Sequence, residues 1–173
     1  MTKRRLIFYL FHAVQLTCAQ VGKGSRLVEA LKAQRDTKPV THVWPGFADI
    51  LLPGMTIGMT GVIAGTGNLF PHLLVELYQT AQQAFEKKDF ALLNKAQALQ
   101  SVVTQADWAL AKAGIAGSKW AVSQFQYDVG LPRRPLQPYG KEAQANLVKD
   151  LAEPLKREKE LALAKGDQYV PKI

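Results

Sequence analysis

The hydrophobic pattern of the chain changes near Pro71, and this change limits the folds available to it. Before Pro71, short apolar runs rich in β-branched and aromatic residues alternate with short helical segments. After Pro71, apolar residues recur every three or four positions, as in amphipathic helices. Alternating strands and helices are typical of parallel β/α units, whereas successive helices form a layer of their own. We therefore expect an α/β part followed by an all-helical part.

Three runs in the first part have the composition of strands. They are residues 6–16, 40–44 and 61–65. Two helical segments alternate with them, at residues 25–34 and 47–57. Ser25 is the expected N-cap of the first, because its hydroxyl can accept a hydrogen bond from an amide of the first turn.

Four helices are expected in the second part. They are residues 72–85, a segment beginning at Asp89, residues 115–127, and a segment beginning at Lys141. Asp89 can cap its helix through its carboxylate. We expect the last helix to break near Pro154, because proline lacks an N–H and its ring clashes with the preceding turn. Residues 131–138 contain three prolines and should be extended.

Length and charge exclude several classes of protein. At 173 residues the chain is shorter than a complete eight-unit β/α barrel, which needs roughly 200 residues or more. The net charge is +8, and residues 1–40 contribute +6 of it, from eight basic and two acidic side chains. These basic residues are spread out rather than gathered with stacking aromatic rings, so we expect no nucleic-acid partner.

The start of the chain admits two interpretations. Residues 1–19 combine basic residues with an apolar stretch, as signal peptides do. A buried strand explains the same stretch, since it is rich in β-formers and contains His12. No run approaches the roughly 18 apolar residues that cross a bilayer. We expect a cytoplasmic protein with no membrane partner, and secretion is the alternative.

The residue pattern alone identifies no catalytic or metal site. His12, His42 and His72 are spaced at thirty-residue intervals, but their flanks do not repeat. Cys18, the only cysteine, is interpreted as a packing residue, since a nucleophile would need a positioned base. Gly65-Thr-Gly-Asn68 is interpreted as a tight turn, because it lacks the lysine of a phosphate-binding loop. We expect neither a metal nor a cofactor.

Several short motifs follow one another between about Ala13 and Leu136 in a recognisable order. They are Gly46 with Ile50-Leu-Leu-Pro53, Gly58-Met-Thr-Gly-Val-Ile-Ala64, Asn68-Leu-Phe-Pro71, Val75-Glu-Leu-Tyr78, Ala106-Asp-Trp-Ala-Leu110, Gly114-Ile-Ala-Gly-Ser-Lys119 and Gly130-Leu-Pro-Arg-Arg-Pro-Leu136. Together these motifs resemble the C-terminal half of the dihydrodipicolinate synthase and N-acetylneuraminate lyase family. They look closest to the fungal members that cleave 2-keto-3-deoxy sugar acids.

This resemblance implies the C-terminal half of a (β/α)8 TIM barrel. About three β/α units, equivalent to strands six to eight, would occupy residues 1–88, and the family's C-terminal helical extension would occupy residues 89–173. The resemblance also implies class I aldolase or lyase chemistry. In that chemistry, a lysine at the end of the sixth strand forms a Schiff base with pyruvate or another 2-keto acid. Members are usually dimers or tetramers, so an oligomer is expected.

The chain departs from the family pattern at the catalytic position. The alignment implied by residues 14–18 places Gln15 where the family has the Schiff-base lysine. An amide cannot condense with a ketone, because its nitrogen lone pair is delocalised. The family's proton-shuttling tyrosine and carboxylate-binding motif lie in the half that is not matched. Gly46, Ile63 and Asn68 carry over as walls of the substrate site. Lys23 is not expected to replace the lysine.

We therefore expect a truncated lyase-family homologue, or pseudo-enzyme, with no intact catalytic residue. It would have little activity by itself on a pyruvate-like 2-keto acid. The alternative is a non-catalytic interaction module, which associates with another copy or with a complementary half through its exposed half barrel. Unpaired strand edges and uncovered apolar faces favour such association. An incomplete gene product is a further alternative.

Overall fold

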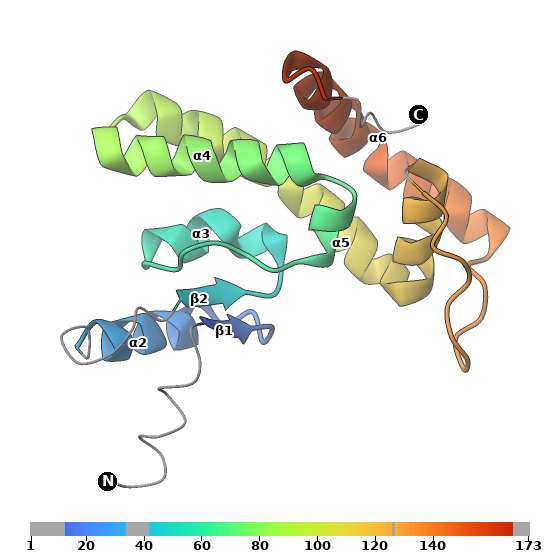
Figure 1. Cartoon of the computed structure of the whole chain (residues 1–173), viewed down its shortest axis with the longest axis horizontal. Helices are drawn as coiled ribbons and strands as arrows, with labels where there is room; N and C mark the ends of the chain where they lie inside the picture. Colours follow the sequence, from blue (N-terminus) through green and yellow to red (C-terminus); the bar gives the residue numbers. More distant parts are fainter. Residues whose placement is uncertain (1–12, 34–41, 126, 168–173) are drawn as a thin grey trace, which may run out of the picture. The chain divides into compact units, whose positions relative to one another are not determined.

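The described residues form two compact units. A computed structural model describes residues 13–33, 42–125 and 127–167 (Figure 1). The units divide between Ala64 and Gly65. This division groups the helix 71–87 with the helices that follow it. The expected boundary between residues 88 and 89 rests on the family resemblance and stays a prediction.

The first unit is built on two parallel strands. Its elements are β1 (Ala13–Leu16), α2 (Val21–Lys32), β2 (His42–Pro45), the 3-10 helix η2 (Ala48–Ile50) and α3 (Leu51–Thr56). In β1 and β2, Ala13 is paired with His42 and Gln15 with Trp44. Parallel strands joined by a helix form a β/α unit, so the expected α/β character of this part is confirmed.

The core of this unit lies on one face of the two strands. Val28 of α2, Val43 of β2 and Met59 are buried together, and Leu16 packs against them from β1. Residues alternate between the faces of a strand, so Val43 and Leu16 point to the helical side while their neighbours point away.

Two expectations for this unit were wrong. Helix α2 begins at Val21 with Gln20 as its N-cap, so Ser25 lies inside the helix and caps nothing. Residues 61–65 do not form the expected third strand. Thr60 and Ile63 each donate one backbone hydrogen bond to β2, to the carbonyls of Val43 and Pro45, both at 3.1 Å. Two isolated bonds do not make a ladder, so the described part shows two strands instead of three.

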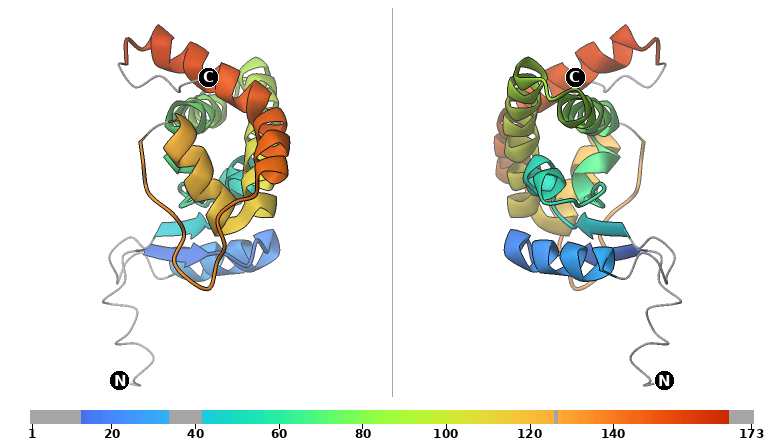
Figure 2. Two further views of the ribbon diagram at one scale, coloured as in Figure 1. Left: turned by 90° about the vertical axis from the view of Figure 1, so that its right-hand side faces the viewer. Right: turned by 90° about the vertical axis from the view of Figure 1, so that its left-hand side faces the viewer.

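The second unit is helical throughout its described residues. It contains the 3-10 helix η3 (Gly65–Asn68), α4 (Pro71–Lys87), α5 (Phe90–Phe125) and α6 (Lys141–Ala164). The three long helices pack on one another (Figure 2). Leu73, Leu77 and Ala81 form the buried stripe of α4, as their spacing predicted.

Helix α5 begins and bends where the sequence indicates. Asp89 Oδ1 accepts hydrogen bonds from the backbone amides of Ala91 at 2.8 Å and Leu92 at 3.2 Å, which confirms its capping role. Gly114 interrupts the helix with φ 61° and ψ −163°. Glycine adopts this backbone conformation readily because it has no Cβ. The helix expected after Gly114 is therefore confirmed, since α5 consists of two helices that meet at a kink at this residue.

Helix α6 continues through Pro154, so the expected break there was wrong. The side chains of Leu151, Pro154 and Leu155 are all buried, and this packing outweighs the loss of one backbone hydrogen bond. Residues 127–140, called the strap below, connect α5 to α6. They contain no helix, as expected, but residues 131–138 are not extended throughout, because the N–H of Leu136 donates to Arg133 O at 3.1 Å and closes a turn.

Within the described ranges, no helix is both long enough and apolar enough to cross a membrane.

Candidate functional site

The exposed face of the β1–β2 sheet carries the candidate site. Residues paired in register point to the same side of a sheet, so Gln15 shares its face with Trp44. His42, two residues before Trp44, shares that face as well. This is the face opposite the apolar core of the first unit. Three polar or aromatic side chains thus gather where the resemblance predicts a catalytic lysine.

Gln15 links three segments of this unit. Its side-chain amide donates a hydrogen bond to the carbonyl oxygen of Ile63 at 2.9 Å. The backbone N–H of Ile63 in turn donates to Pro45 at the end of β2. The side chain of Gln15 is exposed, and that of Ile63 is 47% exposed. The two residues that the resemblance placed at one site are therefore in direct contact.

Gly46 allows the chain segments after β1 and β2 to approach closely. Its N–H donates to Leu16 at 3.2 Å. A Cβ at this position would lie 2.4 Å from Oγ1 and 2.8 Å from Cα of Thr17, too close for any other residue. Only glycine fits here without movement of the backbone. Gly46 thus has a structural reason for its identity, independent of any contact with a substrate.

His42 and Trp44 are neighbours of Gln15 that sequence reasoning missed. Their rings are stacked, with centroids 5.7 Å apart and planes inclined by 10°. His42 Nδ1 also lies 3.0 Å from Thr60 Oγ1. The alternation of faces along a strand, combined with the parallel register, could have identified both. The sequence alone suggested His42 only as one of three widely spaced histidines.

Asn68, the remaining predicted wall of the substrate site, belongs to the second unit. Its side-chain amide donates to Gly65 O at 3.0 Å and closes η3. In the same turn, the hydroxyl of Thr66 donates to the buried carboxylate of Asp107 on α5. These contacts give the Gly65–Asn68 turn a defined shape, in agreement with its interpretation as a tight turn.

The other candidate residues do not form a catalytic cluster. Cys18 is an exposed free thiol in the turn after β1, so its interpretation as a packing residue was wrong. Lys23 lies in the first turn of α2 and is exposed. Among the described residues, no group of three or more His, Cys, Asp or Glu side chains could hold a metal ion.

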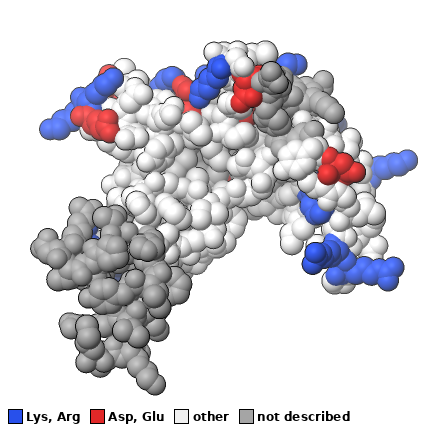
Figure 3. All heavy atoms as spheres, viewed as in Figure 1, with Lys and Arg blue, Asp and Glu red and all other residues white. Residues whose placement is uncertain are grey.

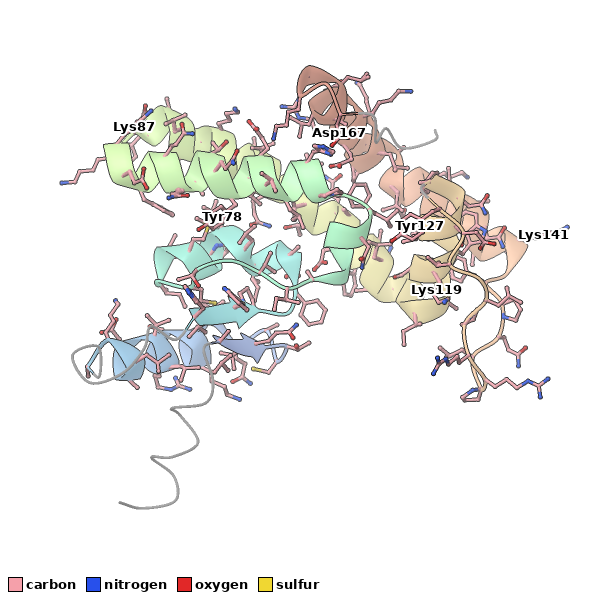
Figure 4. The ribbon with its side chains drawn as sticks, in the orientation of Figure 1. Tyr78, Lys87, Lys119, Tyr127, Lys141 and Asp167 are labelled. Atoms are coloured by element: carbon pink, nitrogen blue, oxygen red, sulfur yellow. The ribbon has the colours of Figure 1, made fainter. Side chains whose placement is uncertain are left out.

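Lys119, in the second half of α5, contacts the strap. Its ammonium donates to the carbonyl of Val129 at 2.8 Å (Figure 4). A cavity of about 310 Å³ lies between the strap and α5, with Trp120 and Tyr139 among its walls. Their ring centroids are 6.0 Å apart. Its polar wall residues Ser123 and Gln144 hydrogen-bond within the same region, to Asp128 and Tyr139.

Comparison with known proteins identifies the family. The model of the dihydrodipicolinate synthetase family matches residues 17–154. The chain belongs to this family. The family resemblance seen in the motifs is thereby confirmed.

Relatives in the dihydrodipicolinate synthetase family show how much of a member this chain represents. It is 32% identical over 125 residues to an L-threo-3-deoxy-hexylosonate aldolase of Hypocrea jecorina, covering 71% of this chain and 38% of the relative. It is 29% identical over 159 residues to a protein of the same name from Aspergillus niger, covering 80% of this chain and 45% of the relative. The chain therefore spans less than half the length of these relatives.

Solved structures support the same fold. A dihydrodipicolinate synthase family protein from Coccidioides immitis matches with a TM-score of 0.63 and 28% identity, covering 86% of this chain and 47% of that protein. Dihydrodipicolinate synthase from Thermotoga maritima matches with a TM-score of 0.68 and 22% identity, covering 83% of this chain and 45% of that one. The fold is therefore that of the dihydrodipicolinate synthase structures over a shared portion.

Proposed function

We propose that this chain is a carbon–carbon lyase homologue, of the 2-keto acid aldolase type, that forms no Schiff base at the family's lysine position. The observation that carries the proposal is Gln15, on the exposed face of β1, with its amide engaged by the carbonyl of Ile63. Gln15 lies just before the segment matched by the family model, so its equivalence to the lysine rests on its place in β1.

The chemistry of an amide supports this proposal. Schiff-base formation needs a neutral amine whose lone pair attacks the ketone carbon. The amide nitrogen of Gln15 has no such lone pair, and its N–H is directed to Ile63 O. A pyruvate-like 2-keto acid would bind without a covalent bond. Gly46 and Ile63 stay the proposed walls of its site in the first unit, and the role of Asn68 stays a prediction from the resemblance.

Borohydride trapping tests the proposal directly. The chain is incubated with pyruvate, reduced with borohydride, and its intact mass is measured. We expect no adduct for the wild-type chain. We expect Gln15→Lys to gain one reduced pyruvate adduct, because the new amine would stand on the exposed face of β1.

Two controls separate the possible outcomes. Gln15→Met fills the same space without an amine and should show no adduct. If the wild-type chain itself gains a pyruvate adduct, another lysine performs the chemistry and the proposal is wrong. If folded Gln15→Lys gains no adduct, the equivalence of Gln15 to the lysine is wrong.

A specific observation favours the second candidate, a non-catalytic module that associates with another copy or a complementary half. Within the described residues, β1 has a partner strand on one edge only. An unpaired edge presents backbone donors and acceptors to another chain. We expect light scattering to report a species larger than the monomer. A stable monomer, unchanged on addition of the N-terminal half of a relative, would contradict this candidate.

A further inference from the structure

The cavity beside the strap has walls from two helices as well as from the strap. Ala116, Trp120 and Ser123 come from the second half of α5, and Gln144 comes from α6. Residues 116, 120 and 123 recur every three or four positions, so they share one face of the helix. At about 310 Å³, the cavity has the size of a site for a small molecule. It lies within the second unit, so it is independent of the function proposed for Gln15.

Two aromatic rings in the walls are held in position. The rings of Trp120 and Tyr139 have centroids 6.0 Å apart and planes inclined by 37°. A Cβ at Gly117 would lie 3.0 Å from Cε2 and Cζ of Tyr139, so glycine lets this ring lie directly on α5. The Gln144 amide donates to the backbone carbonyl of Tyr139 at 2.7 Å. Trp120 packs edge-on against Phe125, with centroids 6.4 Å apart.

Asp128 places a carboxylate in the same walls. Its Oδ1 accepts the N–H of Gly130 at 2.8 Å and the hydroxyl of Ser123 at 3.3 Å. Its Oδ2 forms no hydrogen bond or ion pair with any residue that the structure describes. One oxygen of a fixed carboxyl group is therefore available to a ligand.

The groups around Asp128 use their donors on one another. The hydroxyl of Ser123 donates to Asp128 and accepts the N–H of Val129 at 3.1 Å. Pro132 and Pro138, which also form the walls, have no N–H. A carboxylate oxygen only accepts hydrogen bonds, so a ligand that contacts Oδ2 must bring its own donor.

The basic residues of this region lie outside the walls. Lys119 donates to the carbonyl of Val129, and Arg133, Arg134 and Lys141 are exposed. Figure 3 shows basic side chains projecting at the lower right, where the strap lies. Solvent and salt screen such exposed charges. The described walls themselves contain one acidic residue and no basic one.

We propose that this cavity binds a small organic cation, an amine or amidine carried on an apolar body. The N–H groups of the cation donate to Asp128 Oδ2, and its body lies on Trp120 and Tyr139. The faces of aromatic rings attract cations, and those of Trp do so most strongly. A charged donor also makes a stronger hydrogen bond to a carboxylate than a neutral donor does. A cation therefore uses both features of the walls.

Titration of the ¹⁵N-labelled full chain with benzamidine tests the proposal. Benzamidine joins a phenyl ring to a planar, cationic pair of N–H donors. Benzamide is neutral and benzoate is anionic, and both have nearly the same shape. We expect saturable shifts of the Trp120 indole and Gly130 amide signals. Benzamidine should bind at least about tenfold more tightly than benzamide, because hydrogen bonds between charged groups are stronger, and benzoate should bind most weakly.

Asp128→Asn is the matched variant. It keeps an oxygen for the N–H of Gly130 and replaces Oδ2 by an amide nitrogen, so the strap should retain its shape. We expect the affinity for benzamidine to fall about tenfold, while that for benzamide stays unchanged. Glu142→Gln removes an exposed acidic residue of α6 outside the walls and should change neither affinity.

Tyr139→Leu is a second variant, which keeps Asp128 and removes one ring. We expect it to weaken benzamidine binding as well. Equal affinities of the wild-type chain for the three ligands would overturn the proposal. So would shifts spread over the surface without saturation, or an unchanged benzamidine affinity in folded Asp128→Asn.

Discussion

The two compact units are stabilised by different kinds of contact. The first unit has a small apolar core around Val28, Val43 and Met59. Its hydrogen bonds outside the helices are mostly between neighbouring strands and turns. The second unit adds buried hydrogen bonds between helices far apart in sequence. Glu158 accepts one from the start of α4, and Asp107 accepts one from Thr66. A helix forms its backbone hydrogen bonds internally, so contacts between helices are made by side chains. A strand depends on a neighbouring strand for its backbone partners.

The largest expected effect concerns the buried carboxylate of Glu158, which accepts hydrogen bonds from the start of α4. Glu158→Ala removes the carboxylate that accepts from the N–H groups of His72 and Leu73, so we expect the free energy of unfolding to fall by about 3–5 kcal/mol. Urea denaturation followed by circular dichroism measures this. Glu153→Ala, exposed on the same helix, should change it by less than about 0.5 kcal/mol. If Glu158→Ala and Glu153→Ala lowered the free energy of unfolding equally, the buried hydrogen bonds of Glu158 would not stabilise the second unit.

The next effect concerns close backbone approach in the first unit. Gly46→Ala places a Cβ 2.4 Å from Thr17 Oγ1, so we expect a loss of about 1–3 kcal/mol. Hydrogen exchange should show faster opening of β1 and β2, with α4 unchanged. Gly22→Ala, where a Cβ meets only the far end of Arg26 at 3.6 Å, is the control. If Gly46→Ala left the free energy of unfolding unchanged, the segments after β1 and β2 could move apart with little loss of stability.

A smaller effect compares the helix caps of the two units. Asp89 caps α5, whereas Gln20 at the start of α2 makes no side-chain cap. We expect Asp89→Ala to lower the free energy of unfolding by about 1 kcal/mol, and Gln20→Asp to raise it by up to about 1 kcal/mol. Thermal unfolding of both variants checks this. A destabilised Gln20→Asp would show that α2 begins differently in solution.

The smallest effect is a pH dependence at the surface of the second unit. The pKa of Glu76 is lowered from its ordinary value of 4.5, chiefly by the hydrogen bond from Lys95. Burial raises this pKa, and the charges of Lys95, Lys165 and Arg157 lower it further. A carboxyl group whose pKa is lower in the folded than in the unfolded state stabilises the fold at pH values above its unfolded-state pKa. This stabilisation is lost as the pH falls through the folded-state pKa.

Glu76→Gln should therefore lower the free energy of unfolding by about 0.5–1 kcal/mol at pH 7. The difference from the wild-type chain should shrink as the pH falls below 4.5. Denaturation at several pH values measures it, with Glu153→Gln as the control. A difference that grows toward low pH would contradict the assigned sign.

Local signals predicted much of the fold. The apolar stripe of α4, the cap at Asp89 and the bend at Gly114 follow from residues close together in sequence. Expectations that depended on distant neighbours were wrong. Pro154 stays within α6 because its ring is buried. Residues 61–65 form no strand, since Ile63 donates one backbone hydrogen bond to β2 and the other comes from Thr60, outside this run.

The candidate site divides in the same way. The resemblance singled out Gln15, Gly46, Ile63 and Asn68, and the contact between Gln15 and Ile63 could not be derived from spacing. His42 and Trp44 became neighbours of Gln15 through strand register. Register is set by pairing between segments distant in sequence, so periodicity within one strand does not define it.

By itself, the sequence determined the family, the order of β/α and helical parts, and the amide at the proposed lysine position. Each depends on residue identity or on spacing within one segment. Only the tertiary structure decided that Gln15 contacts Ile63 and that Glu158 and Asp167 enclose His72. These contacts join residues 48, 86 and 95 positions apart. Such contacts arise from the packing of whole elements, which no local pattern encodes.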